Sequence, residues 1–475
     1  MRIKLNFKKE DLTANFILGL NFFIIFSRIL NINSNILYQL STILRNLVFL
    51  PDNFGRTSQL AAQSSSKLVL PIYNCTQTCP SQLKNRKITY QKIQYLIPNE
   101  NKLHEWGKGY ADLVVYNYSD IRSPFYDNRN NKRSLNYLSL QDYNDIYDQL
   151  YLESIKEIDK FWEIQKKYCE NGSECIFSVP EIKMLEDYSF RGGIPEIYHY
   201  TWFTCGVKFG MLNFLSIFSV LKFADQPDKV KIFIHTDCDD LFKGSDNIWF
   251  NKIMKIAGNN RLIIQKIYLI DSIWNNKVSL GKAVHISDVY RIFLLAKFGG
   301  IYLDNDMVLL KSHKKFLRND ENHKNHNLII AEESAASLAN GFMMASPSTL
   351  VNPNKILLKW LQEYKYYQNI MMGPYSVMKI WALSQKYPEE ITIVKNQMVR
   401  PNWLEIDLLF GDKVLLWGED DDNDFYNMHL NSRYIDKMML KHYNHTIREF
   451  SDIDCLTNTF GEVARFILYG NKDIC

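Results

Sequence analysis

Apolar and polar positions recur with regular spacing over residues 194–303, and this pattern predicts alternating strands and helices. Short runs rich in Ile, Val and Tyr predict strands, and longer apolar runs predict buried helices. The predicted strands are 194–202, 230–235, 261–270 and 301–303, and the predicted helices are 207–223, 249–257 and 285–298. We therefore expect the α/β class, with a parallel sheet, covering helices, and ligands at the carboxyl ends of the strands.

Two glycines end the helix 285–298, and the strand 301–303 follows them directly. Gly299 and Gly300 follow the predicted helix directly, at the position where helices commonly end in a left-handed cap. Glycine adopts that conformation without strain. No Gly-x-Gly-x-x-Gly turn follows the first strand, and there is no Walker loop. A dinucleotide-dependent oxidoreductase and a P-loop phosphotransferase are therefore disfavoured.

The first 90 residues are predicted to anchor the chain in a membrane. An uncharged, mostly apolar stretch, 12–27, follows a start rich in Arg and Lys. A spanning helix needs about 20 apolar residues, so this stretch is slightly short. The positive-inside rule predicts a cytosolic tail at 1–11, a signal-anchor transmembrane helix at 12–30 and a luminal stem at 31–90. The alternative is an amphipathic or buried N-terminal helix.

Cysteines and glycosylation sequons also favour the lumen of the secretory pathway. The eight cysteines are even in number, and Cys75/Cys79 and Cys169/Cys175 are close pairs that can close small loops in an oxidising space. Sequons for N-linked glycans begin at Asn74, Asn117, Asn171 and Asn444. We expect a single-pass type II protein of the Golgi or secretory-pathway membrane, with disulfides, glycans and a luminal catalytic domain.

Composition excludes several classes of protein. The chain carries 56 Lys and Arg against 52 Asp and Glu, a net charge of +4, and 46% of its residues are hydrophobic. These values argue against a disordered chain, a polytopic transporter and a strongly basic nucleic-acid binder. A Tyr- and Asn-rich region at 91–185, with a helical pattern at 145–168, has no assigned function.

Charged residues gather around the two glycines. Asp288 and Arg291 stand three apart, so they share one face of the predicted helix. Asp304 and Asp306 follow the strand 301–303, and a strand period of two would point both carboxylates to the same side. Two neighbouring carboxylates repel one another unless a cation lies between them, and Mg²⁺ or Mn²⁺ prefers such oxygen ligands.

The run His285 to Met307 resembles the sugar-binding segment of the DXD-containing glycosyltransferases, a group that includes alpha-1,4-galactosyltransferases, alpha-1,6-mannosyltransferases and the glucosylating domains of clostridial toxins. Ile194 to Trp202 is similar to the family's Ile-Pro-x-Ile-x-His-x-x-Trp element. The resemblance implies a GT-A fold at 186–450, with a Rossmann-like nucleotide-binding half and an acceptor-binding half, before a C-terminal tail at 451–475. It also implies a nucleotide-sugar donor, with a UDP-sugar favoured over GDP-mannose, Mn²⁺ or Mg²⁺, and retention of anomeric configuration.

The resemblance assigns roles to individual residues. Asp304 matches the first acid of the motif, which touches the donor and reaches the metal through water, and Asp306 matches the second acid, a direct ligand. Asp288 and Arg291 match donor-sugar contacts and complete the catalytic set. His429 matches a C-terminal histidine near the metal. His199 and Trp202 match positions where the first strand meets the nucleotide base.

Other residues complete the candidate site. Asp237 lies in an acidic cluster after a buried strand, Lys282 is a candidate cation, and His285 opens the helix; these three join the donor-binding set. On the acceptor side, Glu332 or Glu333 would place a carboxylate near the anomeric carbon. Two further acceptor-side elements are short matches to the family, namely Asn340-Gly341 and Gly373-Pro374.

The sequence thus predicts a metal-dependent enzyme that transfers a sugar from a nucleotide sugar to a glycan or glycolipid. One alternative is a glycoside hydrolase, whose two carboxylates would flank a sugar about 5–10 Å apart. The other alternative is a non-catalytic, transferase-like domain that binds a glycan or a cation.

Overall fold

The computed structural model describes part of the chain. The described residues are 70, 73–74, 79–80, 88–91, 140–170 and 194–474, except 204, 239–246, 276, 318–326, 335–336, 348–353, 368–373, 395–397, 400, 402–406, 412, 416, 418–424, 431–434 and 444–448. The predicted cytosolic tail and anchor, most of the stem, and the sequons at Asn117, Asn171 and Asn444 lie outside them. The described residues all belong to one compact unit, Lys67–Cys475.

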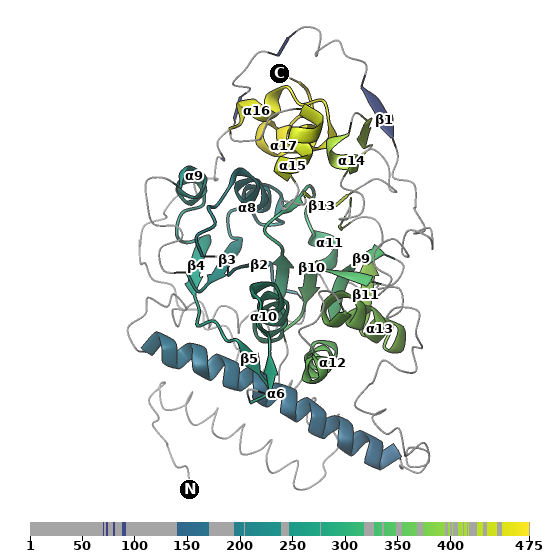
Figure 1. Ribbon diagram of the computed structural model, residues 1–475. Helices are drawn as coiled ribbons and strands as arrows, with labels where there is room; N and C mark the ends of the chain where they lie inside the picture. Colours follow the sequence, from purple (N-terminus) through teal and green to yellow (C-terminus); the bar gives the residue numbers. More distant parts are fainter. Residues whose placement is uncertain are drawn as a thin grey trace, which may run out of the picture. The chain divides into compact units, whose positions relative to one another are not determined.

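Within the described residues, seven strands form the main sheet in the order β11-β9-β10-β7-β2-β3-β4 (Figure 1). Strands β7, β2, β3 and β4 are parallel to one another, whereas β10 runs antiparallel to both β7 and β9. The strands are β2 Ile197–Trp202, β3 Lys231–Thr236, β4 Leu262–Lys266, β7 Gly300–Leu303, β9 Leu328–Ser334, β10 Ser337–Ala345 and β11 Ile391–Val394. The predicted α/β class is confirmed.

The helices between these strands lie where the hydrophobic pattern places them. The three that connect the parallel strands are α8 Met211–Phe223, α9 Ile248–Ala257 and α10 Ala283–Phe298, and the expected helix near 145–168 is α6 Leu140–Glu170. The remaining helices are α11 Lys314–Leu317, α12 Lys355–Glu363, η2 Tyr364–Tyr366, η3 Pro374–Met378, α13 Lys379–Lys386, α14 Asp407–Phe410, α15 Ile435–Tyr443, α16 Ser451–Asp454 and α17 Thr459–Tyr469. The short strands outside the main sheet are β1 Thr89–Gln91, β5 Ser272–Ile273, β6 Val278–Ser279, β8 Met307–Leu309, β12 Lys413–Leu415 and β13 Asn427–His429.

Hydrophobic cores cover both faces of the sheet, because successive strand residues point to opposite sides. Ile301 and Leu303 of β7 join a core with α8, α9 and α17, whereas Tyr302 joins a second core with α10, α12 and α6. Figure 1 shows α8 and α10 on either side of these strands. Burial on both faces explains why the strand segments read as nearly continuous apolar runs.

Gly299 and Gly300 are required by backbone geometry and by packing. Both have positive φ, +64° and +97°, but Gly299 has ψ of −159°, so it does not adopt the left-handed helical cap that the sequence predicted. A Cβ at 299 would lie 2.5 Å from Pro347, and a Cβ at 300 would lie 2.6 Å from the carbonyl oxygen of Ile197. The chain therefore turns directly from α10 into β7, and this turn delivers the end of β7 to the site.

Segments expected to be stem and tail contribute to this unit. Tyr73 packs edge-on against Phe214 of α8, with 6.5 Å between ring centroids. Cys79 forms a disulfide with Cys455, 376 residues later, and does not close the small loop to Cys75 that the spacing allows. After residue 450 the chain forms α16 and α17 instead of a loose tail, because their apolar residues fill the α8 core. No helix among the described residues is both long and apolar enough to span a membrane.

The alanine variant of Gly299 should be less stable than a matched variant of Gly206. Gly206 has a similar φ of +87° but no atom within 4 Å of an added Cβ. Both variants carry the backbone strain of positive φ, and only Gly299→Ala adds overpacking, which costs about 1–3 kcal/mol. Thermal unfolding should therefore show a clearly lower Tm for Gly299→Ala. Equal Tm values would contradict the packing role.

Candidate functional site

The two acids of the motif lie on a turn at the carboxyl end of β7. The backbone N–H of Met307 donates to the carbonyl of Asp304 at 3.0 Å, which closes a four-residue turn between β7 and β8. The expectation that strand alternation aligns Asp304 and Asp306 is therefore wrong, since both follow the last residue of β7. The sheet order reverses between β2 and β7, and α/β proteins bind ligands at the strand ends of such a boundary.

Asp304 faces α10 and β10. Its Oδ1 accepts a hydrogen bond from the Tyr302 hydroxyl at 3.1 Å and lies 3.6 Å from Nη2 of Arg291. The backbone of Gly341 lies against it, and a Cβ there would be 2.6 Å from Asp304 Oδ2. The carboxylate is 39% exposed, so it is held by the protein and still open to a ligand.

Asp306 faces His429 on the neighbouring strand β13. Residues 427–429 pair with β8, and His429 Nε2 lies 3.3 Å from Asp306 Oδ1. Burial lowers the pKa of His429, but the carboxylates of Asp306 and Asp304 raise it above its ordinary value. The structure thus brings together the three metal ligands that the sequence predicted from segments more than 100 residues apart.

Arg291 is the buried centre of the polar site, with 4% of its surface exposed. Its Nη2 lies 3.2 Å from Asp288 Oδ1, and its Nη1 donates to the carbonyl of Asn340 at 2.7 Å. The amide of Asn340 in turn donates to Asp288 Oδ1 at 2.8 Å. Burial raises the pKa of Asp288 to about 6, although Arg291 lowers it. The predicted Asp288–Arg291 pair is therefore present, and Asn340 completes it from β10.

Sequence reasoning missed a chain of hydroxyl groups that joins β2 to this site. Thr201 Oγ1 lies 2.7 Å from Ser287 Oγ and 2.8 Å from the Tyr302 hydroxyl, which donates to Asp304. Thr201 lies near the end of the apolar strand β2, and Tyr302 lies within the apolar strand β7. The sequence around each therefore indicates only an ordinary strand residue. Strand pairing between β2 and β7 brings them together, which no local pattern reveals.

A second missed residue supports the strand that carries His429. His313 is fully buried, and its Nε2 lies 2.9 Å from the side-chain oxygen of Asn427. Glu333, at the end of β9, is partly buried and accepts a hydrogen bond from Ser337 at 3.2 Å. Burial raises the pKa of Glu333, and interaction with His429 lowers it. Glu333 therefore lies beside the predicted metal ligands, and the adjacent Glu332 lies in the register opposite Leu338.

His199 and Trp202 are core residues, in contrast to their predicted contact with a nucleotide. His199 is 1% exposed, and its ring nitrogens contact the carbonyl of Gly299 at 3.0 Å and His235 at 3.1 Å. Trp202 is 5% exposed and packs near Phe209. Both side chains are occupied by packing between strands and helices, so the structure does not offer them to a donor.

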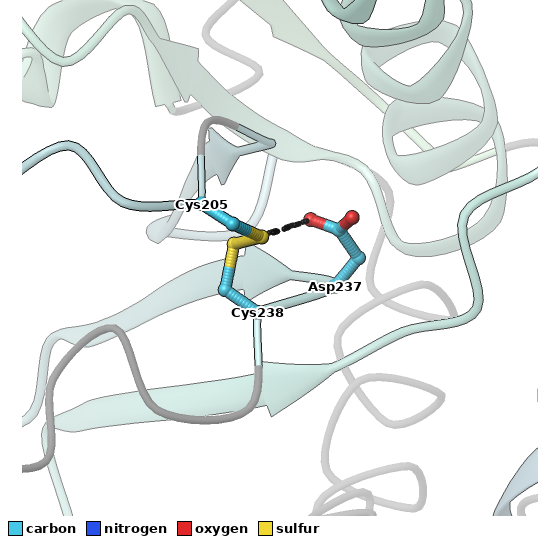
Figure 2. A group of neighbouring side chains, drawn as sticks. All are labelled: Cys205, Asp237 and Cys238. Carbon is cyan, nitrogen blue, oxygen red and sulfur yellow. Dashed lines mark hydrogen bonds between the residues drawn. A yellow bond between two sulfur atoms is a disulfide. The ribbon is translucent and has the colours of Figure 1, made fainter.

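Asp237 lies beside a disulfide at the carboxyl ends of β2 and β3. Figure 2 shows the Cys205–Cys238 disulfide with the Asp237 carboxylate next to it, 3.7 Å and 3.5 Å from the two sulfur atoms. Among the described residues, these three form the group of metal-ligand types whose atoms all lie within 4.8 Å of one another. Since a disulfide has no thiolate to offer and no hydrogen to donate, we assign no metal to it.

The remaining predicted residues are placed as follows. Lys282 is exposed at the N-cap of α10, and His285 is buried one turn later, edge-on to Tyr367 at 5.3 Å. Burial lowers the pKa of His285. Gly373 lies outside the described residues, and Pro374 begins the short helix η3.

Comparison with known proteins agrees with this geometry. Residues 222–333 match the family model described as a glycosyltransferase sugar-binding region containing a DXD motif. This segment is a DXD-type glycosyltransferase region. The match contains α10, the acidic turn and β9 as far as Glu333, and it confirms the predicted family for this segment.

Individual proteins show a more distant similarity to this chain. Glucan organizing enzyme 1 of Cryptococcus neoformans is 25% identical over 143 residues, which are 30% of this chain and 37% of that protein. This chain thus spans well under half of the length of that curated relative. The PaToxG glycosyltransferase is 17% identical, with 43% of this chain and 76% of that chain covered at a TM-score of 0.27. Mouse xyloside xylosyltransferase 1 is 12% identical, with 50% and 98% covered at a TM-score of 0.32.

Acid should destabilise the protein partly through His313. Burial lowers the pKa of His313 to about 4, against 6.5 when unfolded. The unfolded chain therefore binds the proton first, and stability that is complete above pH 6.5 is lost as the pH falls towards 4, by on the order of 3 kcal/mol. His313→Gln keeps a donor for Asn427. Its free energy of unfolding, measured with urea, should decrease less between pH 6.5 and pH 4 than that of the wild type. An unchanged fall would contradict this assignment.

Proposed function

We propose that this chain is a metal-dependent GT-A glycosyltransferase that moves a sugar from a nucleotide sugar to a glycan or glycolipid. The observation that carries the proposal is the meeting of Asp304, Asp306 and His429 at the end of β7, beside the buried Asp288–Arg291 pair. A UDP-sugar donor and retention of anomeric configuration are part of the proposal, and they are supported by resemblance to the family.

The chemistry of the three ligands fits a divalent cation. The two carboxylates suit Mn²⁺ or Mg²⁺, and imidazole is a ligand more typical of transition metals than of Mg²⁺. The ligand atoms of the three residues do not all lie within 4.8 Å of one another. When bound, such an ion supplies positive charge to the diphosphate that leaves the sugar.

The protein's own groups have separate tasks in this proposal. Asp288 and Asn340, fixed by Arg291, present polar atoms to the donor sugar, while Arg291 itself directs its hydrogen bonds to protein acceptors. Lys282 is exposed at the start of α10, where the helix N-terminus favours an anionic diphosphate. Glu333, whose carboxyl interacts electrostatically with His429 and Asp304, is the group that we assign to the acceptor hydroxyl.

The compartment remains part of the proposal. Two disulfides, Cys79–Cys455 and Cys205–Cys238, support a protein that matures in an oxidising space. We therefore keep the expectation of a luminal enzyme of the Golgi or secretory pathway, anchored in the membrane by residues 12–30.

Replacement of Asp306 should abolish transfer. Asp306→Asn keeps the size of the side chain and removes the charge that holds the ion, so turnover should fall about 100-fold or more. The assay follows release of the nucleotide diphosphate from UDP-sugars, with GDP-mannose as comparison, in the presence of Mn²⁺. The control is Asp407→Asn, since Asp407 is a 71% exposed acid paired with Lys441. Full activity of Asp306→Asn, or activity without any divalent metal, would refute the metal-dependent mechanism.

Gly341→Ala should weaken the site without a change of charge. The added Cβ would lie 2.6 Å from Asp304 Oδ2 and must displace that carboxylate. We expect Mn²⁺ to bind about 10-fold more weakly, since an altered ligand orientation typically costs that much. The control is Gly411→Ala, directly after α14, whose Cβ would lie 2.8 Å from the carbonyl oxygen of Asp407. Gly411→Ala should lose stability and keep its Mn²⁺ affinity, and the same affinity in Gly341→Ala would contradict the prediction.

A further inference from the structure

Asn305 stands between the two acids and has contacts of its own. Its side-chain Nδ2 donates to the carbonyl oxygen of Thr201 at 2.8 Å. Thr201 lies near the carboxyl end of β2, on the other side of the boundary where the sheet order reverses. The side chain between the acids therefore ties the acidic turn to the neighbouring strand.

A second contact holds the same residue from α8. Asn213, in the first turn of that helix, donates from Nδ2 to the carbonyl oxygen of Asn305 at 3.2 Å. The side-chain oxygen of Asn213 accepts from the N–H of Gly210 at 2.8 Å, at the start of the helix. Asn213 is thus fixed at both ends of its amide, and it joins the helix terminus to the acidic turn.

Backbone hydrogen bonds hold the two acids on either side. The N–H of Asp304 donates to the carbonyl of Gly341 at 2.8 Å, and the N–H of Leu430 donates to the carbonyl of Asp306 at 2.8 Å. These bonds need no particular side chain at either acid. The bond from Asn305 to Thr201 is different, because it requires a donor on the side chain at position 305.

Thr201 is also linked to Asp304, the first acid, through the hydroxyl of Tyr302. Its hydroxyl lies 2.8 Å from that of Tyr302, which donates to Asp304. The carbonyl of Thr201 holds Asn305, and its hydroxyl supports the group that orients Asp304. One strand residue therefore sets both the backbone of the turn and the direction of the first carboxylate.

We propose that Asn305 is a positioning residue that fixes the separation and direction of Asp304 and Asp306 for a divalent cation. This proposal rests on the metal-dependent function above and deepens it. An alanine at 305 removes the tie to the carbonyl of Thr201 on β2, while the backbone bonds to Gly341 and Leu430 and the contact from Asn213 remain. The two carboxylates are then held less firmly, so the ion binds more weakly even though every ligand is present.

The test measures Mn²⁺ binding to the full-length protein by electron paramagnetic resonance of the free ion. Asn305→Ala should bind Mn²⁺ about 10- to 100-fold more weakly than the wild type, the usual effect of losing a group that orients a ligand. Transfer should recover as the Mn²⁺ concentration rises, with kcat near the wild-type value at saturation. A loss of kcat that saturating Mn²⁺ does not restore would overturn the positioning role.

The matched control is Asn354→Ala. Asn354 is a buried amide, whose Nδ2 donates to the carbonyls of Asn327 and Ser346 at 2.6 Å and 2.9 Å, and it caps α12. Its loss should lower Tm and leave Mn²⁺ affinity unchanged. If Asn305→Ala behaves in the same way, Asn305 is a stabilising residue and the proposal fails.

Asn213→Ala gives a second test that leaves the acidic turn itself unaltered. It removes the contact from α8 and should weaken Mn²⁺ binding in the same direction by a smaller factor, so it decides the matter if Asn305→Ala does not fold. Wild-type affinity in a folded Asn213→Ala protein would count against the proposal. Absence of Mn²⁺ binding by the wild type would instead refute the metal-dependent function, and the role of Asn305 with it.

Discussion

The site depends on the ion pairs and hydrogen bonds that the buried guanidinium of Arg291 makes. A charge at this depth is costly unless it is paired and fully hydrogen-bonded. Asp288 and Asp304 supply the negative charge, and the carbonyl of Asn340 accepts a further hydrogen bond. These partners come from α10, the end of β7 and β10, so satisfying one cation fixes three elements relative to one another.

The order of strands explains how distant residues meet. β2 lies beside β7, which lies beside β10, and β13 pairs with β8 immediately after the acidic turn. Each strand delivers one polar group to the same edge: Thr201, Asp304, Asn340 and His429. Polar side chains are tolerated at this edge because each has a partner across a strand boundary.

The sequence predicted the fold well where local periodicity decides it. The alternation of strands and helices over 194–303, the position of the glycine pair and the helix bearing Asp288 and Arg291 are confirmed, since each follows from neighbouring residues. Features that depend on how deeply a side chain is buried, or on which distant segments come into contact, could not be predicted. Spacing of two places His199 and Thr201 on the same face of β2, but only Thr201 lies near the open end of the strand. The spacing of Asp304 and Asp306 likewise does not reveal that a turn, rather than a strand, carries them.

Cysteine pairing illustrates the same limit. Proximity in sequence favours a small loop between Cys75 and Cys79, because short loops close at low entropic cost. The folded chain instead places Cys79 beside Cys455, which follows α16, and apolar residues of α16 and α17 pack in the core there. Cooperative packing of the core thus outweighs the entropy of a long loop.

The segment around Tyr73 contributes to the site indirectly, through its packing against α8. Tyr73 packs against Phe214 and Phe218 of α8, and Phe450 packs against the same group. Phe214 follows Asn213, whose amide holds Asn305 in the acidic turn. A helix that is fixed on its apolar side cannot shift its polar side, because protein interiors are closely packed. Residues that read as a stem therefore help to fix the helix terminus that holds the two acids in place.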